Sequence, residues 1–304
     1  MAIPQLDLKA EYDYLKKDIS RNINACIKYQ QWILGPSVKE CEQSIAEYLK
    51  SRNVTGVASG TDALLLSLRA VALIKKGRAY FRSDDEIITT PFTFVATAEA
   101  IARAGAKPVF VDIDPDTYNL DPKALEKAVN KKTAGIMPVH LYGLACDMER
   151  ISRVAKKNGL FIVEDCAQSF GGEYKGKKLG TFGDCGAFSF FPSKNLGSWG
   201  DAGCICTDSK KIADCLRSLR HHGQEKNGEV KNLGYNSRLD TIQAAVISAK
   251  LKYIDQFNRA RKKVAKTYKQ HLKGQKFITI PFEPLESSHS WALYTVRVKA
   301  KRDK

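Results

Sequence analysis

A lysine in a glycine-rich segment has the surroundings that point most directly to chemistry. Lys194 follows a short apolar run at 187–191, which Pro192 ends because proline cannot donate a hydrogen bond to a strand ladder. Aromatic and small neighbours remove water from a lysine, which lowers its pKa and leaves a nucleophilic amine. Such an amine can form a Schiff base with a carbonyl compound. Alternatively, Lys194 is a surface lysine that simply follows a strand.

A carboxylate and an amide follow another apolar run, at 161–163. Asp165 ends this run, where a carboxylate is costly unless it is paired with a cation or well hydrogen-bonded. A protonated pyridine nitrogen would be such a partner, although capping of the next helix explains the same residue. Gln168 is neutral and can hydrogen-bond a phenolate oxygen or a backbone group.

A phosphate site is predicted where a strand turns into a helix, at Ser59, Gly60 and Thr61. Free backbone N–H groups at a helix N-terminus, the helix dipole and two hydroxyls favour an anion there. A plain helix cap is the alternative. Ser189, on the strand before Lys194, offers another hydroxyl to the same phosphate.

These groups, together with Phe94, match the needs of one cofactor. Phe94 follows another predicted strand and can stack on a flat ring, though core packing is the commoner use of such a residue. A reactive lysine, an acid for a ring nitrogen, a phosphate site and a stacking aromatic are the four parts that hold pyridoxal phosphate. No cysteine or histidine spacing typical of a metal site occurs, so no metal is predicted.

Alternating strands and helices are predicted to position these residues. This alternation, with short connections, is typical of an α/β fold with a mostly parallel sheet and helices on both faces. Ligands of such sheets lie at the carboxyl ends of the strands, where the candidate residues fall. The predicted strands are 54–58, 86–90, 108–112, 134–139 and 160–164, and the predicted helices are 63–74, 94–104, 122–129 and 148–157.

The pattern changes after Arg238. Residues 240–272 are predicted to form a long helix, broken near 253–255, and two strands are predicted at 277–280 and 292–299. We therefore expect a large cofactor-binding domain with an N-terminal helical arm at 1–245, and a small α+β domain at 246–304.

Composition excludes several classes of protein. The chain has 304 residues, of which 43% are hydrophobic, enough for a sizeable core. No apolar run could span a bilayer and the N-terminus lacks the apolar stretch of a signal peptide, so a cytoplasmic location is expected. The eight cysteines are spread along the chain and are expected to be reduced and buried.

The net charge of +16 fits nucleic acid, an anionic surface or a phosphorylated substrate. The basic residues are spread over predicted helix faces, and no nucleic-acid-binding motif is visible. Nucleic-acid binding therefore rests on charge alone.

Eight segments together resemble the nucleotide-sugar aminotransferases of the DegT/StrS type, which are pyridoxal phosphate enzymes of fold type I. The resemblance runs from about residue 3 to residue 299. The segments, in the order of that family, are SGTDAL at 59–64, TFVATAEAI at 93–101, PVFVDIDPDTYNLDP at 108–122, PVHLYG at 138–143, VEDCAQSFG at 163–171, FSFFPSKNLG at 188–197, GDAG at 200–203 and GYNSRLDTIQAA at 234–245.

The resemblance implies a role for each candidate residue. Lys194 binds the cofactor covalently and later shuttles protons, and Asp165 pairs with the pyridine nitrogen. Arg238 faces the sugar or its carboxylate, or else forms a structural ion pair. The other residues are implied to contact the cofactor as well. Gly60, Thr61 and Ser189 bind its phosphate, Phe94 stacks on its ring face and Gln168 lies near its ring hydroxyl. Asn236 reaches the phosphate of the cofactor bound by the other subunit of a homodimer.

The implied activity is transfer of an amino group from an amino acid, glutamate in this family, to a keto sugar on a nucleoside diphosphate. Relatives with histidine in place of Lys194 dehydrate sugars instead, so the lysine favours amino transfer. The motifs are most similar to those of enzymes that aminate C3, such as 3-keto N-acetylglucosaminuronate aminotransferases of polysaccharide synthesis. Family members extend beyond the position of residue 304, so the small domain is expected to be incomplete relative to theirs. This expectation leaves a non-catalytic regulatory paralogue that binds the cofactor as an alternative.

Overall fold

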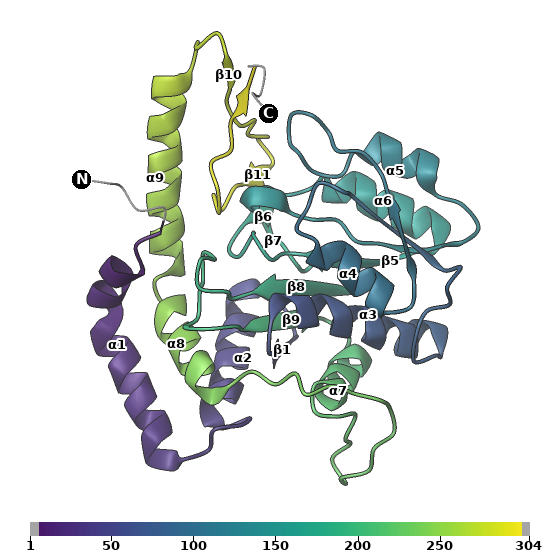
Figure 1. Cartoon of the computed structure of the whole chain (residues 1–304), viewed down its shortest axis with the longest axis vertical. Helices are drawn as coiled ribbons and strands as arrows, with labels where there is room; N and C mark the ends of the chain where they lie inside the picture. The colour runs from purple at the N-terminus through teal and green to yellow at the C-terminus, as the bar shows by residue number, and fades with distance from the viewer. Residues whose placement is uncertain (1–5, 300–304) are drawn as a thin grey trace, which may run out of the picture.

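The computed structural model describes residues 6–299, which fold around a seven-stranded sheet (Figure 1). The strand order is β1-β9-β8-β5-β4-β2-β3, and β9 alone runs against the others, antiparallel to both β1 and β8. The mostly parallel sheet predicted from the sequence is therefore confirmed. The strands are β1 (Asn53–Val57), β2 (Glu86–Thr89), β3 (Lys107–Phe110), β4 (Thr133–Ile136), β5 (Phe161–Asp165), β8 (Cys185–Ser189) and β9 (Gly203–Thr207).

Helices cover both faces of this sheet. One face packs against α3, α4 and α7, and the other packs against α2 and α8 at one end and α5 and α6 at the other. The helices are α1 (Leu8–Tyr29), α2 (Pro36–Leu49), α3 (Gly60–Lys76), α4 (Ala96–Arg103), α5 (Pro122–Ala128), α6 (Met148–Asn158), α7 (Lys210–Leu219), α8 (Thr241–Leu251) and α9 (Ile254–Leu272), with a 3-10 turn η1 (Leu141–Gly143).

Strand alternation decides which face of the sheet each side chain of β5 takes. Successive side chains of a strand point to opposite faces. Ile162 joins the core beneath α5 and α6, whereas Val163 joins the core beneath α3 and α4. The same period directs Glu164 to the first of these faces and Asp165 to the second.

Helix α3 is the central helix of the fold and is buried without interruption from Ala63 to Ala72. Its start is fixed by Ser59, whose side chain accepts a hydrogen bond from the backbone N–H of Asp62. Its end is fixed by Gly77, which adopts the left-handed conformation at φ +66° that glycine tolerates. The amino end of α3 thus lies at a defined place beside β8.

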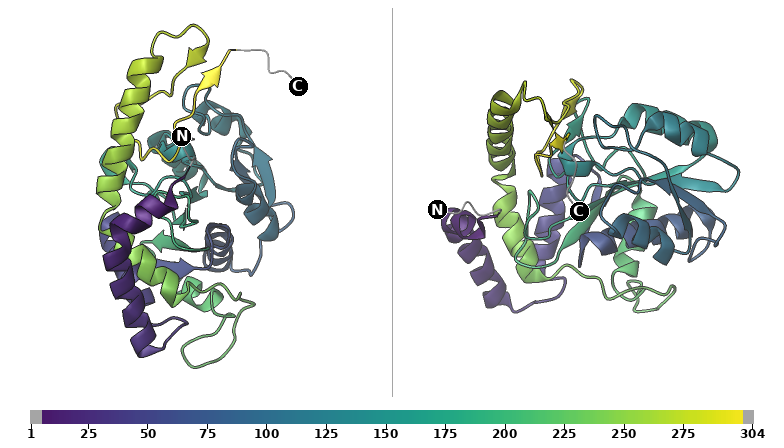
Figure 2. Two further views of the ribbon diagram at one scale, coloured as in Figure 1. Left: turned by 60° about the vertical axis from the view of Figure 1, so that its left-hand side comes forward. Right: turned by 45° about the horizontal axis from the view of Figure 1, so that its top comes forward.

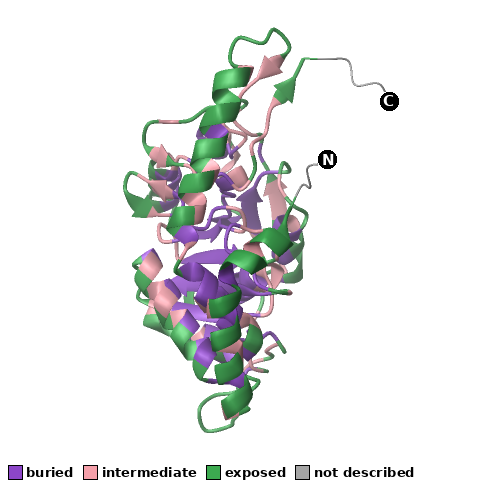
Figure 3. Ribbon diagram, turned by 90° about the vertical axis from the view of Figure 1, so that its left-hand side faces the viewer, coloured by how far each residue is buried: buried purple, intermediate pink, exposed green. Residues whose placement is uncertain are grey.

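The N-terminal helix α1 lies along α8, and Leu15 and Ile19 pack against Val246 and Ala249 (Figure 2). The break predicted in the long helix is confirmed, because α8 ends at Leu251 and α9 begins at Ile254. Helix α9 extends away from the sheet and has only two buried residues. Most of the buried residues of the described chain lie around the sheet (Figure 3).

Short strand pairs lie outside the large sheet. Beside α9, β10 (Ile278–Thr279) pairs with β12 (Arg297–Val298), and β11 (Ser287–Ser288) pairs with β6 (Glu173–Tyr174), which also pairs with β7 (Lys177–Lys178). The predicted domain boundary between residues 245 and 246 lies inside α8 and stays a prediction.

Several predicted strands have other bounds in the structure, and the one predicted at 134–139 is a strand only over Thr133–Ile136. The strand predicted at 187–191 lies at Cys185–Ser189, because the carbonyl of Phe190 is taken by the amide and hydroxyl of Ser198. The strand therefore ends before Pro192 is reached. The strand predicted at 292–299 is ordered as a ladder only at Arg297–Val298, since the preceding residues bond to the η1 turn instead.

The eight cysteines are free thiols, and all except the half-buried Cys215 are buried, as the sequence predicts. Across residues 6–299, no helix is both long enough and apolar enough to cross a membrane.

Candidate active site

A cavity of about 500 Å³ opens at the carboxyl ends of β5 and β8. The cavity brings together seven of the nine candidate residues from segments far apart in the sequence. The carboxyl ends of the strands are where ligands bind in open α/β sheets. The lining residues are Ser59, Gly60, Thr61, Leu64, Thr93, Phe94, Ala96, Thr97, Val139, Asp165, Ala167, Gln168, Ser189, Phe191, Ser193, Lys194 and Asp201.

Asp165 presents a buried and oriented carboxylate to this cavity, with only 4% of its surface exposed. Thr97 donates its hydroxyl hydrogen to Oδ2 at 2.8 Å, and the N–H of Ala167 donates to Oδ1 at 3.1 Å. Burial raises the pKa of Asp165, while these two hydrogen bonds and the charge of Lys194 oppose the rise. The two hydrogen bonds offset part of the cost of burying the charged carboxylate of Asp165, and a cation in the cavity would offset more of it.

Lys194 lines the same cavity and is half-buried. Burial lowers its pKa, and the negative charge of Asp165 opposes that shift. A lowered pKa increases the fraction of neutral, nucleophilic amine near neutral pH. The desolvation expected from the sequence is thus present at this lysine.

The amino end of α3 and the end of β8 form one side of the cavity. Ser59 accepts the N–H of Asp62 with its side chain and the N–H of Ala63 with its carbonyl. The N–H groups of Gly60 and Thr61 precede these in the helix and point beyond its end. A side chain on Gly60 would place its Cβ atom 2.5 Å from that of Ser189. Glycine therefore allows the helix end and the Ser189 hydroxyl to lie together, which suits a phosphate.

Gln168 and Phe94 line other parts of the cavity. The side-chain oxygen of Gln168 accepts a hydrogen bond from the N–H of Tyr142 at 2.9 Å, which leaves its NH2 group as the donor for another partner. The ring of Phe94 is 69% exposed, so it does not serve core packing. An exposed ring beside a half-buried amine is available for stacking on a flat ligand.

Asn236 and Arg238 do not line this cavity. Asn236 is exposed and forms an isolated bridge with His221. Arg238 donates to Nδ1 of His221 at 3.2 Å, so its described contact is with an imidazole and not with a carboxylate. Their predicted roles toward a partner subunit or a sugar stay predictions.

Thr97 is a functional residue that sequence reasoning missed. It lies on the first turn of α4, four residues after Thr93, and the two hydroxyls are 2.9 Å apart. The spacing of four residues between Thr93 and Thr97, just after a predicted strand, was the available signal. Only the fold shows that its hydroxyl donates to Asp165.

Glu164 and His140 were also missed, and they support the site from the other face of the sheet. Glu164 is fully buried and accepts hydrogen bonds from Gly180, Phe182 and Gly183 N–H and from His140 Nε2 at 3.0 Å. Nδ1 of His140 accepts the N–H of Cys146, so Nε2 carries the proton. The side-chain atoms of His140, Glu164 and Cys166 that could bind a metal ion lie within 4.8 Å of one another. Four hydrogen-bond donors already engage the Glu164 carboxylate, however, so this cluster is a hydrogen-bonded one.

The cavity fits pyridoxal phosphate on its own features. The cradle between Gly60 and Ser189 can take a phosphate only because no Cβ fills it. At the other end, the donors that the described residues give the buried carboxylate of Asp165 are a hydroxyl and a backbone N–H. A protonated ring nitrogen would supply a cation there. Lys194 lies on the same cavity as an amine with a lowered pKa.

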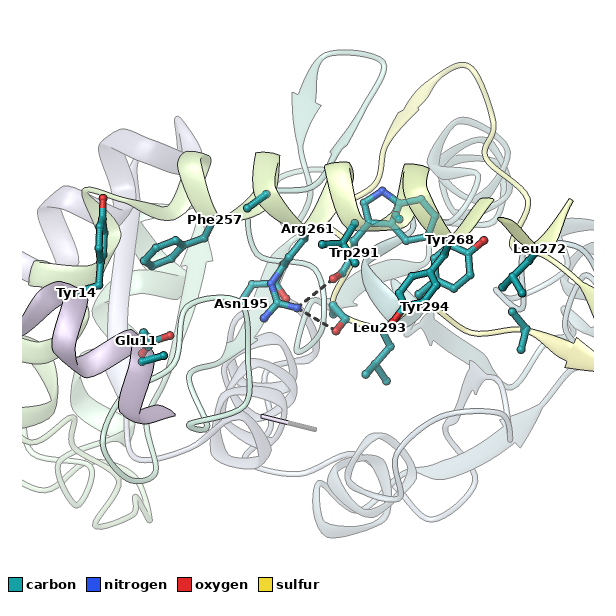
Figure 4. Close-up of a pocket in the computed structure, with 16 residues that line it drawn as sticks. Glu11, Tyr14, Asn195, Phe257, Arg261, Tyr268, Leu272, Trp291, Leu293 and Tyr294 are labelled. Atoms are coloured by element: carbon teal, nitrogen blue, oxygen red, sulfur yellow. Dashed lines mark hydrogen bonds between the residues drawn. The ribbon is translucent and has the colours of Figure 1, made fainter. Parts of the chain in front are cut away.

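A second, larger groove of about 960 Å³ lies between α1, α9 and residues 291–296 (Figure 4). Five of its sixteen lining residues are aromatic, and Arg261 donates to the carbonyls of Trp291 and Ala292 at 3.2 and 3.3 Å. Asn195, the neighbour of Lys194, is one of the lining residues.

Known proteins resemble this chain over nearly all of its length. It is 44% identical to the pleiotropic regulatory protein of Geobacillus stearothermophilus, covering 100% of this chain and 80% of that one. It is 42% identical to the UDP-2-acetamido-2-deoxy-3-oxo-D-glucuronate aminotransferase of Pseudomonas aeruginosa, covering 96% and 79%. The crystal structure of S. venezuelae DesV in complex with a ketimine intermediate superposes with a TM-score of 0.93 at 37% identity, covering 98% and 78%.

The DegT/DnrJ/EryC1/StrS aminotransferase family model matches residues 13–304, and the chain belongs to that family. Another similar structure, from Bacillus subtilis, holds the cofactor as pyridoxamine phosphate. The fold, the cofactor class and the aminotransferase class implied by the sequence motifs are therefore confirmed.

Proposed function

We propose that the protein transfers an amino group from glutamate to the C3 keto group of a sugar carried on a nucleoside diphosphate, in amino-sugar or polysaccharide synthesis. The observation that carries the proposal is the placement of Lys194 and Asp165 on one cavity, each with its pKa shifted by burial. The substrate class is supported by relatives that are UDP-3-oxo-sugar and dTDP-sugar aminotransferases.

Each residue has a defined task in this proposal. The amine of Lys194 would hold the cofactor and, when free, would move a proton at the substrate carbon. Asp165 would hold the ring nitrogen in its protonated form. Pyridoxal phosphate, when bound, supplies an electron-withdrawing ring that stabilises negative charge at that carbon.

The remaining cavity residues orient the cofactor. Gly60, Thr61 and Ser189 are proposed to bind its phosphate, Phe94 its ring face and Gln168 its ring hydroxyl. These contacts would fix the cofactor before any substrate enters, which is the main contribution of a protein to such chemistry.

We propose a homodimer in which Asn236 reaches the phosphate of the partner's site and Arg238 lies toward the sugar. The exposure of Asn236 supports the first part. Reduced cysteines support a cytoplasmic location. Every residue that lines the cavity falls within 1–245, which supports 1–245 as the cofactor-binding part and 246–304 as a smaller part.

The test of cofactor binding uses the purified protein incubated with pyridoxal phosphate. We expect visible absorbance, and borohydride should fix the cofactor on the peptide that contains Lys194. Lys194→Ala should abolish both signals, whereas Lys252→Ala, at an exposed lysine, should keep them. A wild type that stays colourless, or labelling on another lysine, would refute the assignment.

The test of amino transfer adds glutamate and then a panel of nucleotide keto sugars, with products followed by mass. One equivalent of 2-oxoglutarate per site is expected from glutamate alone, and turnover when a 3-keto sugar is present.

The regulatory alternative is favoured by one observation, the name of the relative from Geobacillus stearothermophilus. It predicts cofactor binding without formation of 2-oxoglutarate, so the same experiment separates the two functions.

A further inference from the structure

The loop that carries Lys194 is closed tightly by its own backbone. The N–H of Lys194 donates to the carbonyl of Phe191 at 2.8 Å, and the N–H of Ser198 donates to that of Phe190 at 2.7 Å. Gly197 lies so close to the carbonyl of Pro192 that a side chain there would overlap it. These contacts close residues 190–198 into a tight loop that contains Lys194.

A buried lysine on α8 is hydrogen-bonded to this loop. Lys250, on α8, is 1% exposed, and its ammonium donates to the carbonyl of Gly197 at 2.6 Å. The same ammonium forms an ion pair with Glu11 on α1. A charge buried this completely is costly unless its donors are engaged, so these contacts make it a fixed anchor. The cavity lining does not include Lys250.

A second anchor acts on the residue next to Lys194. Asn195 is 6% exposed, and its NH2 group donates to the carbonyl of Ser290 at 2.7 Å and to the side-chain oxygen of Asn258 at 2.9 Å. Figure 4 shows Asn195 beside Arg261 among the residues that line the groove. The loop is thus attached to α8 through Gly197 and to α9 through Asn195.

We propose that Lys250 is a positioning residue for Lys194, which sets the place of the reactive amine by holding the carbonyl of Gly197. This inference rests on the proposed function of Lys194. A misplacement of about 1 Å at a reacting group can cost about 100-fold in rate, and Lys194 is three residues from the anchored carbonyl. Lys250→Met removes the donor and the charge but keeps an unbranched apolar chain of similar length.

The experiment compares wild type, Lys250→Met and Lys252→Met. Lys252 lies two residues further on and is exposed, so it is the matched control. One readout is hydrogen–deuterium exchange of segment 192–199 in the cofactor-free protein, which does not depend on activity. The other is the rate at which added pyridoxal phosphate becomes trapped on Lys194 by borohydride.

We expect Lys250→Met to speed exchange in segment 192–199 and to slow trapping by about ten-fold or more, while Lys252→Met stays within about two-fold of wild type. A folded Lys250→Met protein with both rates within about two-fold of wild type would overturn the proposal.

If Lys250→Met does not fold, Lys250→Gln, which is uncharged and shorter, is measured in the same two ways. Rates within about two-fold of wild type in folded Lys250→Gln would overturn the proposal. If the wild type does not trap the cofactor on Lys194, the proposed function is refuted. The hydrogen–deuterium exchange result then still tells whether Lys250 orders the loop, because it does not depend on the cofactor.

Discussion

Glu164 and Asp165 are neighbours on β5, yet their carboxylates lie on opposite faces of the sheet. Asp165 points into the cavity with Thr97 and Ala167 as donors, whereas Glu164 is buried against His140 and the loop at 180–183. The first carboxylate is left with room for a cation, and the second is saturated with donors. The two should therefore respond differently to the same substitution.

Asp165→Asn should lower kcat by about 100-fold or more, because the amide cannot stabilise a protonated ring nitrogen. The fold should tolerate the change, since burial already raises the pKa of Asp165. Steady-state turnover and thermal unfolding measure the two effects. Asp201→Asn, at an exposed residue of the same cavity, is the control and should keep most activity. Wild-type kcat in Asp165→Asn would contradict the assigned role.

Glu164→Gln should instead destabilise the fold, by about 2–4 kcal/mol, because its NH2 group would face backbone donors that now bond a carboxylate. Urea unfolding measures this free energy. Glu126→Gln serves as the control, because Glu126 is exposed and its ion pair with Arg150 is long, at 4.0 Å, so less than about 0.5 kcal/mol is expected. Equal stability of the two variants would show that the Glu164 cluster is not structural.

Gly60→Ala should weaken binding of pyridoxal phosphate by about ten-fold or more, because the new Cβ would lie 2.5 Å from that of Ser189 and force the cradle open. Titration of the visible absorbance measures the affinity. Gly77→Ala, at the other end of α3, meets no atom within 4 Å. This control carries only the backbone cost of its positive φ, and its affinity should match wild type.

The reactivity of Lys194 should depend on pH in a way set by burial. Since burial disfavours the ammonium form and lowers the pKa of Lys194, labelling by an amine reagent should rise and level off at lower pH than for the side chain of a free lysine in solution. The negative charge of Asp165 opposes this shift, so Asp165→Asn should move the Lys194 profile lower still. Peptide mass analysis across pH 6–11 measures both profiles. A Lys194 profile at or above that of the free amino acid would contradict the desolvation.

Mixing two inactive variants tests whether Asn236 acts across a dimer. Co-expressed Lys194→Ala and Asn236→Ala chains should form hybrid dimers with one intact site, restoring about one quarter of wild-type activity. If Asn236 serves only its own chain, the mixture should be no more active than Asn236→Ala alone. Separately purified and unmixed variants are the control.

Much of the candidate site could be predicted from sequence because its residues sit at ends of elements. Lys194, Asp165 and Ser189 each follow or end an apolar strand, and Gly60 begins a capped helix. Strand ends of a parallel sheet meet at one edge, so local pattern alone brings these residues together. The same reasoning could not find Thr97, because nothing in the sequence says which helix faces Asp165.

The sequence by itself determined the order of elements, their caps and the mostly parallel sheet, because apolar periodicity and terminating residues act over a few positions. Tertiary structure alone decided that β9 enters the sheet against its neighbours, and that Lys250 is buried against Gly197. Lys250 is separated from Gly197 by 53 positions. No local pattern specifies such a pair, because the contact exists only once α8 has packed beneath the loop.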